Sequence, residues 1–342
     1  MSYCVAVNSS SLAISNIDAD CCFVYSFDSG TITELVELFG EIYYNFKTTP
    51  RILQKACAAF SSDGNLFAFN TNKGKLLSIW NANNWTMVDN KLLPKDATNI
   101  VFTPKTNVAI AGDKKGDVYS FENDPVRILG HSSMILGICF SRDEKYIVTS
   151  DSDEKIRVSH YPNGKIILHY MMGHEAYVSN ICLLNNFLVS GSGDCTLRLW
   201  DLDSGDLVDK LILDRPIRNV VEVSVQHCTA AVQFHDSNEL YFVKLEKNND
   251  NYNFVKTQQE IFQSKVINIG ACDKKLWIFT KNTIHNYTVA KDNNIFKEEN
   301  NLVQETLKEY TESYTALETT DLMVHLYQKM IDRKKRIKEH NT

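Results

Sequence analysis

A repeated unit constrains this chain more than any of its other features. One copy extends from Leu129 to His160 and opens on Gly130-His131. The next copy opens on Gly173-His174, its histidine 43 residues after the first, and closes on Trp200-Asp201. Within each copy, short apolar stretches are separated by turns rich in Asp, Gly, Ser and Lys. This pattern indicates antiparallel strands joined by tight turns.

Seven such units account for most of the chain. We anchor each unit on the residue at the Trp position of its third strand, and successive anchors are 53, 41, 38, 41, 43 and 44 residues apart. The anchors are Phe27, Trp80, Phe121, Ser159, Trp200, Val243 and Tyr287. A period of about 40–45 residues with Gly-His and Trp-Asp marks is typical of WD40 blades. We therefore predict an all-β fold, a seven-bladed WD40 β-propeller over residues 1–300. The long first step predicts an extra loop between Gly30 and Lys47.

The start of the chain bears on how the ring closes. The first strand, Tyr3 to Val7, shows no hairpin partner of its own in the pattern. We therefore expect residues 2–8 to close the ring as the outer strand of the last blade, because this arrangement removes an exposed edge.

Polar residues inside a blade need partners, because a buried polar group is tolerated only when it is hydrogen-bonded. In the fifth blade we expect a hydrogen-bonded chain formed by His174, Ser190, Asp194 and Trp200. We assign His131 the same structural role one blade earlier. Asp153 precedes Asp194 by 41 residues and takes the turn position expected to hold His131.

Composition favours a binding platform over an enzyme. No nucleophile elbow, phosphate-binding glycine loop, His-Glu-x-x-His or Cys-x-x-Cys motif occurs, and nine scattered cysteines suggest buried reduced thiols rather than a metal site. No apolar run reaches 18 residues and the first ten residues do not form a signal peptide, so we expect no membrane association. The net charge is −6, but the segment from Lys329 to Thr342 carries +4 and the remainder −10.

The pattern changes over residues 301–342, where we predict a helical extension with a basic end. A helix is expected from about Asp321 to Glu339, capped by Thr320 or Asp321, with an apolar stripe that includes Leu322 and Leu326. Its basic end suits a solvated helix terminus favoured by the helix dipole, a phosphate contact, or nuclear import.

The turn Asp153-Glu154-Lys155 and the strand that follows it carry alternating charge as far as Arg157. Arg198 occupies the place of Arg157 in the next blade, so a common WD40 strand position is one interpretation of Arg157. A contact to another protein is the other, because arginine forms bidentate pairs with carboxylates and alternating charge selects partners.

Three passages carry a resemblance to a known family. They are Ala111 to Phe121, Leu129 to Leu136 continued by Thr149 to Ser159, and Gly173 to Ser179 continued by Ser190 to Trp200. In these passages the chain resembles the WD-repeat non-catalytic subunit of the tRNA (guanine-N7)-methyltransferase.

The resemblance implies a heterodimer with a separate catalytic chain, which binds S-adenosylmethionine and methylates guanine N7 in the variable region of tRNA. This chain would hold no cofactor and would keep the enzyme in its active shape, in the nucleus and also in the cytoplasm. It implies partner contacts at Asp153, Glu154, Lys155 and Arg157, with Arg157 pairing to an acidic residue. Contacts with tRNA phosphates are implied for Lys329, Arg333, Lys334, Lys335, Arg336 and Lys338.

Two other functions stay open at this point. A general WD40 adaptor in a chromatin, replication or ubiquitin ligase assembly would bind peptides at the mouth of the central channel. A propeller enzyme is the third alternative. The position of the partner separates the first two hypotheses, since the family resemblance implies an interface at the side and rim of the ring.

Overall fold

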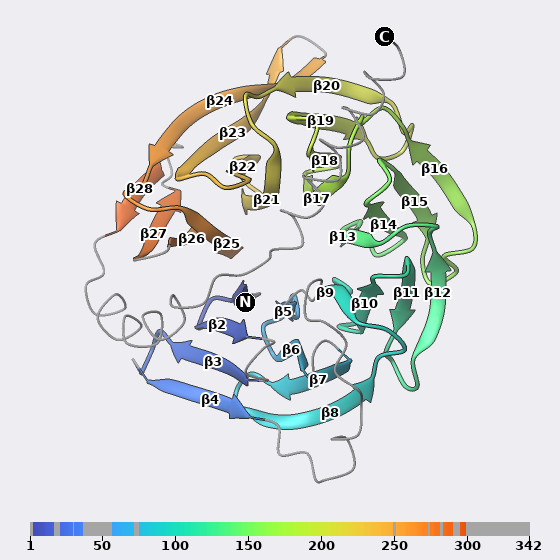
Figure 1. Ribbon diagram of the computed structural model, residues 1–342, viewed down its shortest axis with the longest axis vertical. Helices are drawn as coiled ribbons and strands as arrows, with labels where there is room; N and C mark the ends of the chain where they lie inside the picture. The colour runs from blue at the N-terminus through green and yellow to red at the C-terminus, as the bar shows by residue number, and fades with distance from the viewer. Residues whose placement is uncertain are drawn as a thin grey trace, which may run out of the picture.

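Seven four-stranded antiparallel sheets form a ring around a common centre (Figure 1). The computed structural model describes residues 3–16, 21–29, 31–36, 57–71, 75–248, 251–272, 274–280, 283–289 and 295–298. Within these ranges every regular element is a strand, and each sheet takes its strands in chain order. The predicted seven-bladed propeller is confirmed.

The first four blades take up the N-terminal half of the ring. Blade 1 contains β1 (Tyr3–Val7), β2 (Ser11–Asn16), β3 (Cys21–Ser26) and β4 (Ile32–Val36). Blade 2 contains β5 (Ala58–Phe60), β6 (Leu66–Thr71), β7 (Leu76–Asn81) and β8 (Thr86–Leu92). Blade 3 contains β9 (Ala97–Phe102), β10 (Ala109–Asp113), β11 (Asp117–Ser120) and β12 (Val126–Gly130). Blade 4 contains β13 (Ile135–Phe140), β14 (Tyr146–Asp151), β15 (Ile156–His160) and β16 (Ile167–Met171).

Three further blades complete the ring. Blade 5 contains β17 (Val178–Leu184), β18 (Phe187–Ser192), β19 (Thr196–Asp201) and β20 (Leu207–Ile212). Blade 6 contains β21 (Ile217–Ser224), β22 (Thr229–Phe234), β23 (Glu239–Asn248) and β24 (Asn251–Ile261). Blade 7 contains β25 (Val266–Cys272), β26 (Lys275–Thr280), β27 (Ile284–Val289) and β28 (Ile295–Glu298).

The anchors identified in the sequence mark a real irregularity of the blades. Each anchor lies in the third strand of its blade or directly after it. In four blades the pairing of the third and fourth strands shifts register at the anchor itself, namely at Trp80, Ser159, Trp200 and Val243. A β-bulge bends and twists a strand, so the recurring anchor is where the outer edge of the blade curves.

The prediction that residues 2–8 close the ring within the last blade is wrong. β1 pairs with β2 from Tyr3↔Asn16 to Val7↔Leu12, and β28 supplies the outer strand of blade 7. A short turn allows the hairpin that the pattern did not reveal, because Asn8 Oδ1 accepts hydrogen bonds from the backbone N–H groups of Ser10 (3.0 Å) and Ser11 (2.6 Å).

Side-chain packing rather than a shared strand closes the ring. Buried Leu12 and Tyr25 of blade 1 pack in one cluster with Trp277 and Phe279 of blade 7. The ring of Phe27 stacks on Trp277 with centroids 5.0 Å apart and planes 7° apart. The junction between the first and last blades therefore depends on burial of apolar and aromatic surface.

Cross-blade hydrogen bonds connect the turns on one face of the ring, the face that carries the connections between the first and second strands of each blade. We call this the turn face. Its bonds run from Asn8 to Gly64, Asn107 to Asp63, Thr106 to Glu144, Arg142 to Glu222, Asn185 to Cys228, and Lys274 to Gln226. Together they form a nearly continuous chain of contacts from blade 1 to blade 7.

Two expectations fall largely outside the described residues. The interval from Gly30 to Lys47 contains β4 at Ile32–Val36, but its remaining part is not described, so the extra loop stays a prediction. The helix expected from Asp321 to Glu339 and its basic end also lie outside. In the described part of the chain, no helix is long and apolar enough to cross a membrane.

Candidate functional site

The hydrogen-bonded chain expected in blade 5 is confirmed. Trp200 Nε1 donates to Ser190 Oγ at 2.8 Å, and Ser190 Oγ lies 2.7 Å from His174 Nε2. His174 Nδ1 lies 2.9 Å from Asp194 Oδ2. With the proton of a neutral imidazole on Nδ1, every group in the chain has a partner: Trp200 donates to Ser190, Ser190 to His174, and His174 to Asp194.

Ser190, His174 and Asp194 are linked in the order of a hydrolytic triad, but a substrate cannot reach them. The side chains of His174 and Asp194 are 0% and 5% exposed, and Ser190 is fully buried. The indole N–H of Trp200 already occupies the Ser190 oxygen. A nucleophile must reach its substrate, so the chain of hydrogen bonds joins the loop before blade 5 to its second and third strands.

Blade 4 repeats the part of the arrangement centred on the histidine, with different partners. His131 Nδ1 lies 2.9 Å from Asp151 Oδ2, and Nε2 lies 2.7 Å from Thr149 Oγ1. The expectation that Asp153 holds His131 is therefore wrong. The acidic residue that serves this histidine lies at the end of β14, two positions before the turn residue that aligns with Asp194.

Asp151 also shapes the turn that follows it. Its Oδ1 accepts the backbone N–H groups of Asp153 (2.9 Å) and Lys155 (3.0 Å). Glu154 between them has a positive φ of 72°, a conformation that non-glycine residues adopt in tight turns. The carboxylate of Asp153 is thereby released from the blade and turns to solvent.

The turn Asp153-Glu154-Lys155, which we call the blade 4 turn, presents charges of both signs. Lys155 Nζ pairs with Asp153 Oδ2 at 2.7 Å, and the two side chains are 32% and 50% exposed. The hydrogen bond to Asp153 raises the pKa of Lys155 above its ordinary value. An exposed pair of this kind adds only about 0–1 kcal/mol to stability, so the fold keeps these charges available for other contacts.

Arg157 does not belong to this exposed set, and its prediction as a partner contact is wrong. The residue is 6% exposed. Its Nε donates to Ser159 Oγ at 2.8 Å, Nη1 to the carbonyl of Gly130 at 3.0 Å, and Nη2 to the carbonyl of Gly164. Burial lowers the pKa of Arg157, but a guanidinium remains charged near neutral pH. Arg198, at the same position in blade 5, is 5% exposed, so the common strand position is the correct interpretation.

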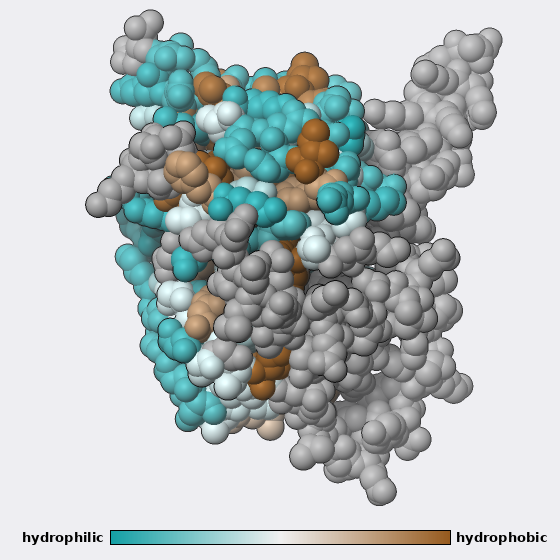
Figure 2. Space-filling view, turned by 90° about the vertical axis from the view of Figure 1, so that its left-hand side faces the viewer, coloured by the Kyte–Doolittle hydropathy of each residue, from teal (hydrophilic) through white to brown (hydrophobic). Residues whose placement is uncertain are grey.

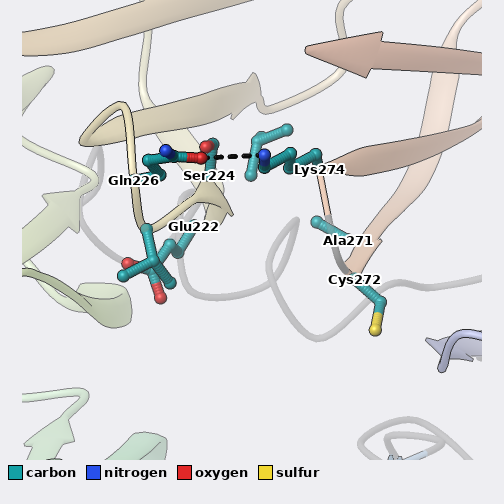
Figure 3. A pocket seen from close by; sticks show the side chains of 8 residues that line it. Glu222, Ser224, Gln226, Ala271, Cys272 and Lys274 are labelled. Atoms are coloured by element: carbon teal, nitrogen blue, oxygen red, sulfur yellow. Dashed lines mark hydrogen bonds between the residues drawn. The ribbon is translucent and has the colours of Figure 1, made fainter. Parts of the chain in front are cut away.

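A pocket that sequence analysis missed lies between blades 6 and 7 on the turn face (Figure 3). It measures about 350 Å³, and its wall includes Glu222 and Lys274. Glu222 Oε1 accepts Arg142 Nη2 at 2.8 Å, and Lys274 Nζ donates to Gln226 Oε1 at 2.8 Å. Both charges are thus engaged within the protein. This pocket was missed in the sequence because periodicity predicts where strands lie, but not which turns enclose a space between them.

Of the predicted site residues, the structure brings together Asp153, Glu154 and Lys155 on one turn, with His131 and Asp151 behind them. The residues predicted to contact tRNA, from Lys329 to Lys338, lie outside the described part of the chain. Within that part, no group of three or more His, Cys, Asp or Glu side chains is arranged to hold a metal ion.

Comparison with known families shows to which family this chain belongs. The model of the family described as "tRNA methyltransferase TRM82 WD40 domain" matches residues 121–317, more than half of the chain. The chain belongs to this family. The matched region begins at the Phe121 anchor and includes the blade 4 turn and both histidine-centred hydrogen-bond chains.

Individual relatives also support membership of this family. Proteins named tRNA (guanine-N(7)-)-methyltransferase non-catalytic subunit match from Xenopus laevis (37% identity; 46% of this chain, 41% of the relative), Dictyostelium discoideum (32%; 61% and 48%) and Homo sapiens (36%; 43% and 38%). The chain thus spans less than half the length of these curated relatives. A chain of the solved structure "Crystal Structure of Mitotic Checkpoint Complex" has a TM-score of 0.66 and 15% identity over 86% of this chain and 87% of its own. That likeness concerns the fold alone.

The buried histidines predict loss of stability in mild acid. Burial lowers the pKa of His174, and burial together with Lys297 lowers the pKa of His285 to about 4. Below pH ~6.5 the unfolded chain therefore binds protons that the folded chain excludes. The free energy of unfolding should be steady above pH ~7 and fall from about 6.5 towards 4, by at most about 1.4 kcal/mol per pH unit for His174. Urea unfolding at pH 7.5, 6.0 and 5.0 measures this, and equal stability at 7.5 and 5.0 would contradict it.

The burial of Arg157 and the exposure of Lys155 predict opposite effects of truncation. Arg157→Ala leaves the Gly130 and Gly164 carbonyls without their donor, so the free energy of unfolding should fall by about 2–4 kcal/mol. Lys155→Ala should change it by less than about 1 kcal/mol. Urea titration of the two variants side by side provides the measurement. Similar losses in both would mean that Arg157 is not structural.

Proposed function

We propose that this chain is the non-catalytic subunit of a tRNA (guanine-N7)-methyltransferase. In this role it binds a separate catalytic chain as a heterodimer and stabilises its active shape, thereby supporting N7-methylguanosine formation in the variable region of tRNA. The observation that carries the proposal is the family match over residues 121–317. The relatives that bear the name of this subunit support it.

The chemistry of the propeller supports a scaffold role. Its best-placed acid–base groups, His131 and His174, are buried and satisfied within blades 4 and 5. S-adenosylmethionine and the methyl-transfer step accordingly belong to the partner. What the propeller offers outward is a rigid edge with charged side chains at the blade 4 turn, which suits recognition of another protein.

The tRNA would be bound jointly by the two chains. In this proposal the basic residues between Lys329 and Lys338 contact tRNA phosphates, since lysine and arginine neutralise phosphate charge without reading base sequence. The same basic run would direct the complex to the nucleus. The alternative of a general WD40 adaptor is not favoured, because the matching family and the relatives compared above are defined by tRNA methylation.

Charge reversal at the blade 4 turn tests the partner contact. Lys155→Glu should weaken binding of the purified catalytic chain by roughly thirtyfold, equivalent to about 2 kcal/mol, because it places like charge against the partner. The double variant Asp153→Lys, Lys155→Glu keeps the ion pair within the turn and serves as the control for folding. It should bind as weakly as the single variant. Calorimetric titration gives the affinities, and wild-type affinity in both variants would exclude the turn from the interface.

Removal of residues 333–342 tests the tRNA contact. The assembled heterodimer should lose affinity for tRNA, and the dependence of log K on log salt should become less steep, because five phosphate-binding cations are removed. Association of the two protein chains should persist. Filter binding at several salt concentrations measures the affinity for tRNA and its dependence on salt. A salt slope identical to that of the full chain would assign tRNA binding to other residues.

A further inference from the structure

The outer strand of blade 4 differs from the other six outer strands of the described sheets. In the segment from Ile166 to Met172, which contains β16, His169 Nε2 lies 2.6 Å from the carbonyl of Asp203. The segment has no Asp, Glu, Lys or Arg. Each of the others has at least one, for example Glu34 in β4, Lys91 in β8, Arg127 in β12, Lys210 in β20, Lys256 in β24 and Lys297 in β28. Charged residues protect edge strands from pairing with other chains. Blade 4 lacks this protection.

The same strand exposes large apolar side chains. Ile166, Ile167, Tyr170 and Met172, which we call the blade 4 strip, are 52%, 42%, 48% and 57% exposed. Figure 2 shows the left-hand side of the ring in Figure 1, where the coloured surface is mostly hydrophilic and its hydrophobic spots are separate from one another. Tyrosine and methionine are enriched where proteins bind one another, so the strip has the composition of an interface.

Exposure alone does not distinguish blade 4, because β8 of blade 2 also exposes apolar residues. Met87 and Val88 are 52% and 57% exposed. They are followed within the strand by Asp89 and Lys91, which form an ion pair of 3.1 Å. The β8 edge is therefore interrupted by charge, whereas the blade 4 strip is not.

Register places the strip beside the blade 4 turn. Met171 pairs with Ile156, the first strand residue after the turn, so Tyr170 and Met172 flank that end of the sheet. Tyr170 also lies directly opposite Arg157 in the pairing of β15 with β16, so the two side chains are on the same face of the sheet. The guanidinium in turn binds the Gly130 and Gly164 carbonyls. Arg157 thus supports the strand pair at the point where Tyr170 forms the edge of the strip.

We propose that the blade 4 strip is the apolar half of the surface that binds the catalytic methyltransferase chain, and that the blade 4 turn is its charged half. This inference rests on the proposed function. The charges of the turn orient the partner and exclude like charge, and the desolvated aromatic and methionine anchors add binding energy. The partner accordingly presents an apolar face next to charged side chains.

The test compares two pairs of substitutions on outer strands. Tyr170→Ser with Met172→Ser removes the anchors of the strip, and Met87→Ser with Val88→Ser makes the matched change on β8. The first pair should weaken binding of the purified catalytic chain by about tenfold or more, and the second should leave it unchanged. Tyr170→Phe, which keeps the ring, should retain most of the affinity. Thermal melting of each variant confirms that the propeller is folded.

Each outcome separates the strip from the proposed function. If the wild-type chain does not bind the catalytic chain, the proposed function fails and the inference fails with it. If the wild type binds and the strip variant binds equally well, only the inference is overturned. An equal loss in the β8 variant overturns it too, since the effect would not be specific to blade 4. Light scattering that shows a dimer of this chain, abolished by the strip variant, would identify a second copy as the occupant instead.

Discussion

The carboxylate of Asp151 is the contact on which the candidate site depends. One oxygen holds His131, and the other holds the backbone of the blade 4 turn at Asp153 and Lys155. A single buried group thus connects the loop between two blades with the exposed charges beside it. Asp113 in blade 3 binds its own turn in the same way but has no histidine. Its second oxygen is left without a partner and burial raises its pKa, which shows what the histidine contributes in blade 4.

The sequence predicted the number of blades because the anchor position corresponds to a physical feature, which in four blades is a bulge between the third and fourth strands. It predicted the hydrogen-bond chain of blade 5 because all four residue types were present at the spacing of a complete repeat. Ring closure was mispredicted because the Asn8 turn is too short to leave a periodic signal. Arg198 in the next blade indicated the structural role of Arg157, but the sequence could not identify its acceptors, since one of them is a carbonyl in the preceding blade, 27 residues away.

The burial of Arg157 shows that a charged residue in a strand can serve the fold and not a binding surface. A guanidinium that donates to two backbone carbonyls supports the blade, and any effect on binding must pass through the residues it fixes. Tyr170, half exposed and paired across the strands with Arg157, is the nearest such residue on the outer strand. The surface offered to a partner then combines an apolar strip that gains from losing water with a charged turn that sets orientation.

The hydrogen bonds between turns on the turn face have a mechanical consequence. Because each turn is tied to a neighbour, and Arg142 reaches past blade 5 to Glu222, one blade cannot tilt without straining several others. A ring of this stiffness loses little conformational entropy when another molecule docks on its edge. In the proposed complex, any adjustment on assembly would therefore fall on the incoming chain, with the propeller as a rigid template.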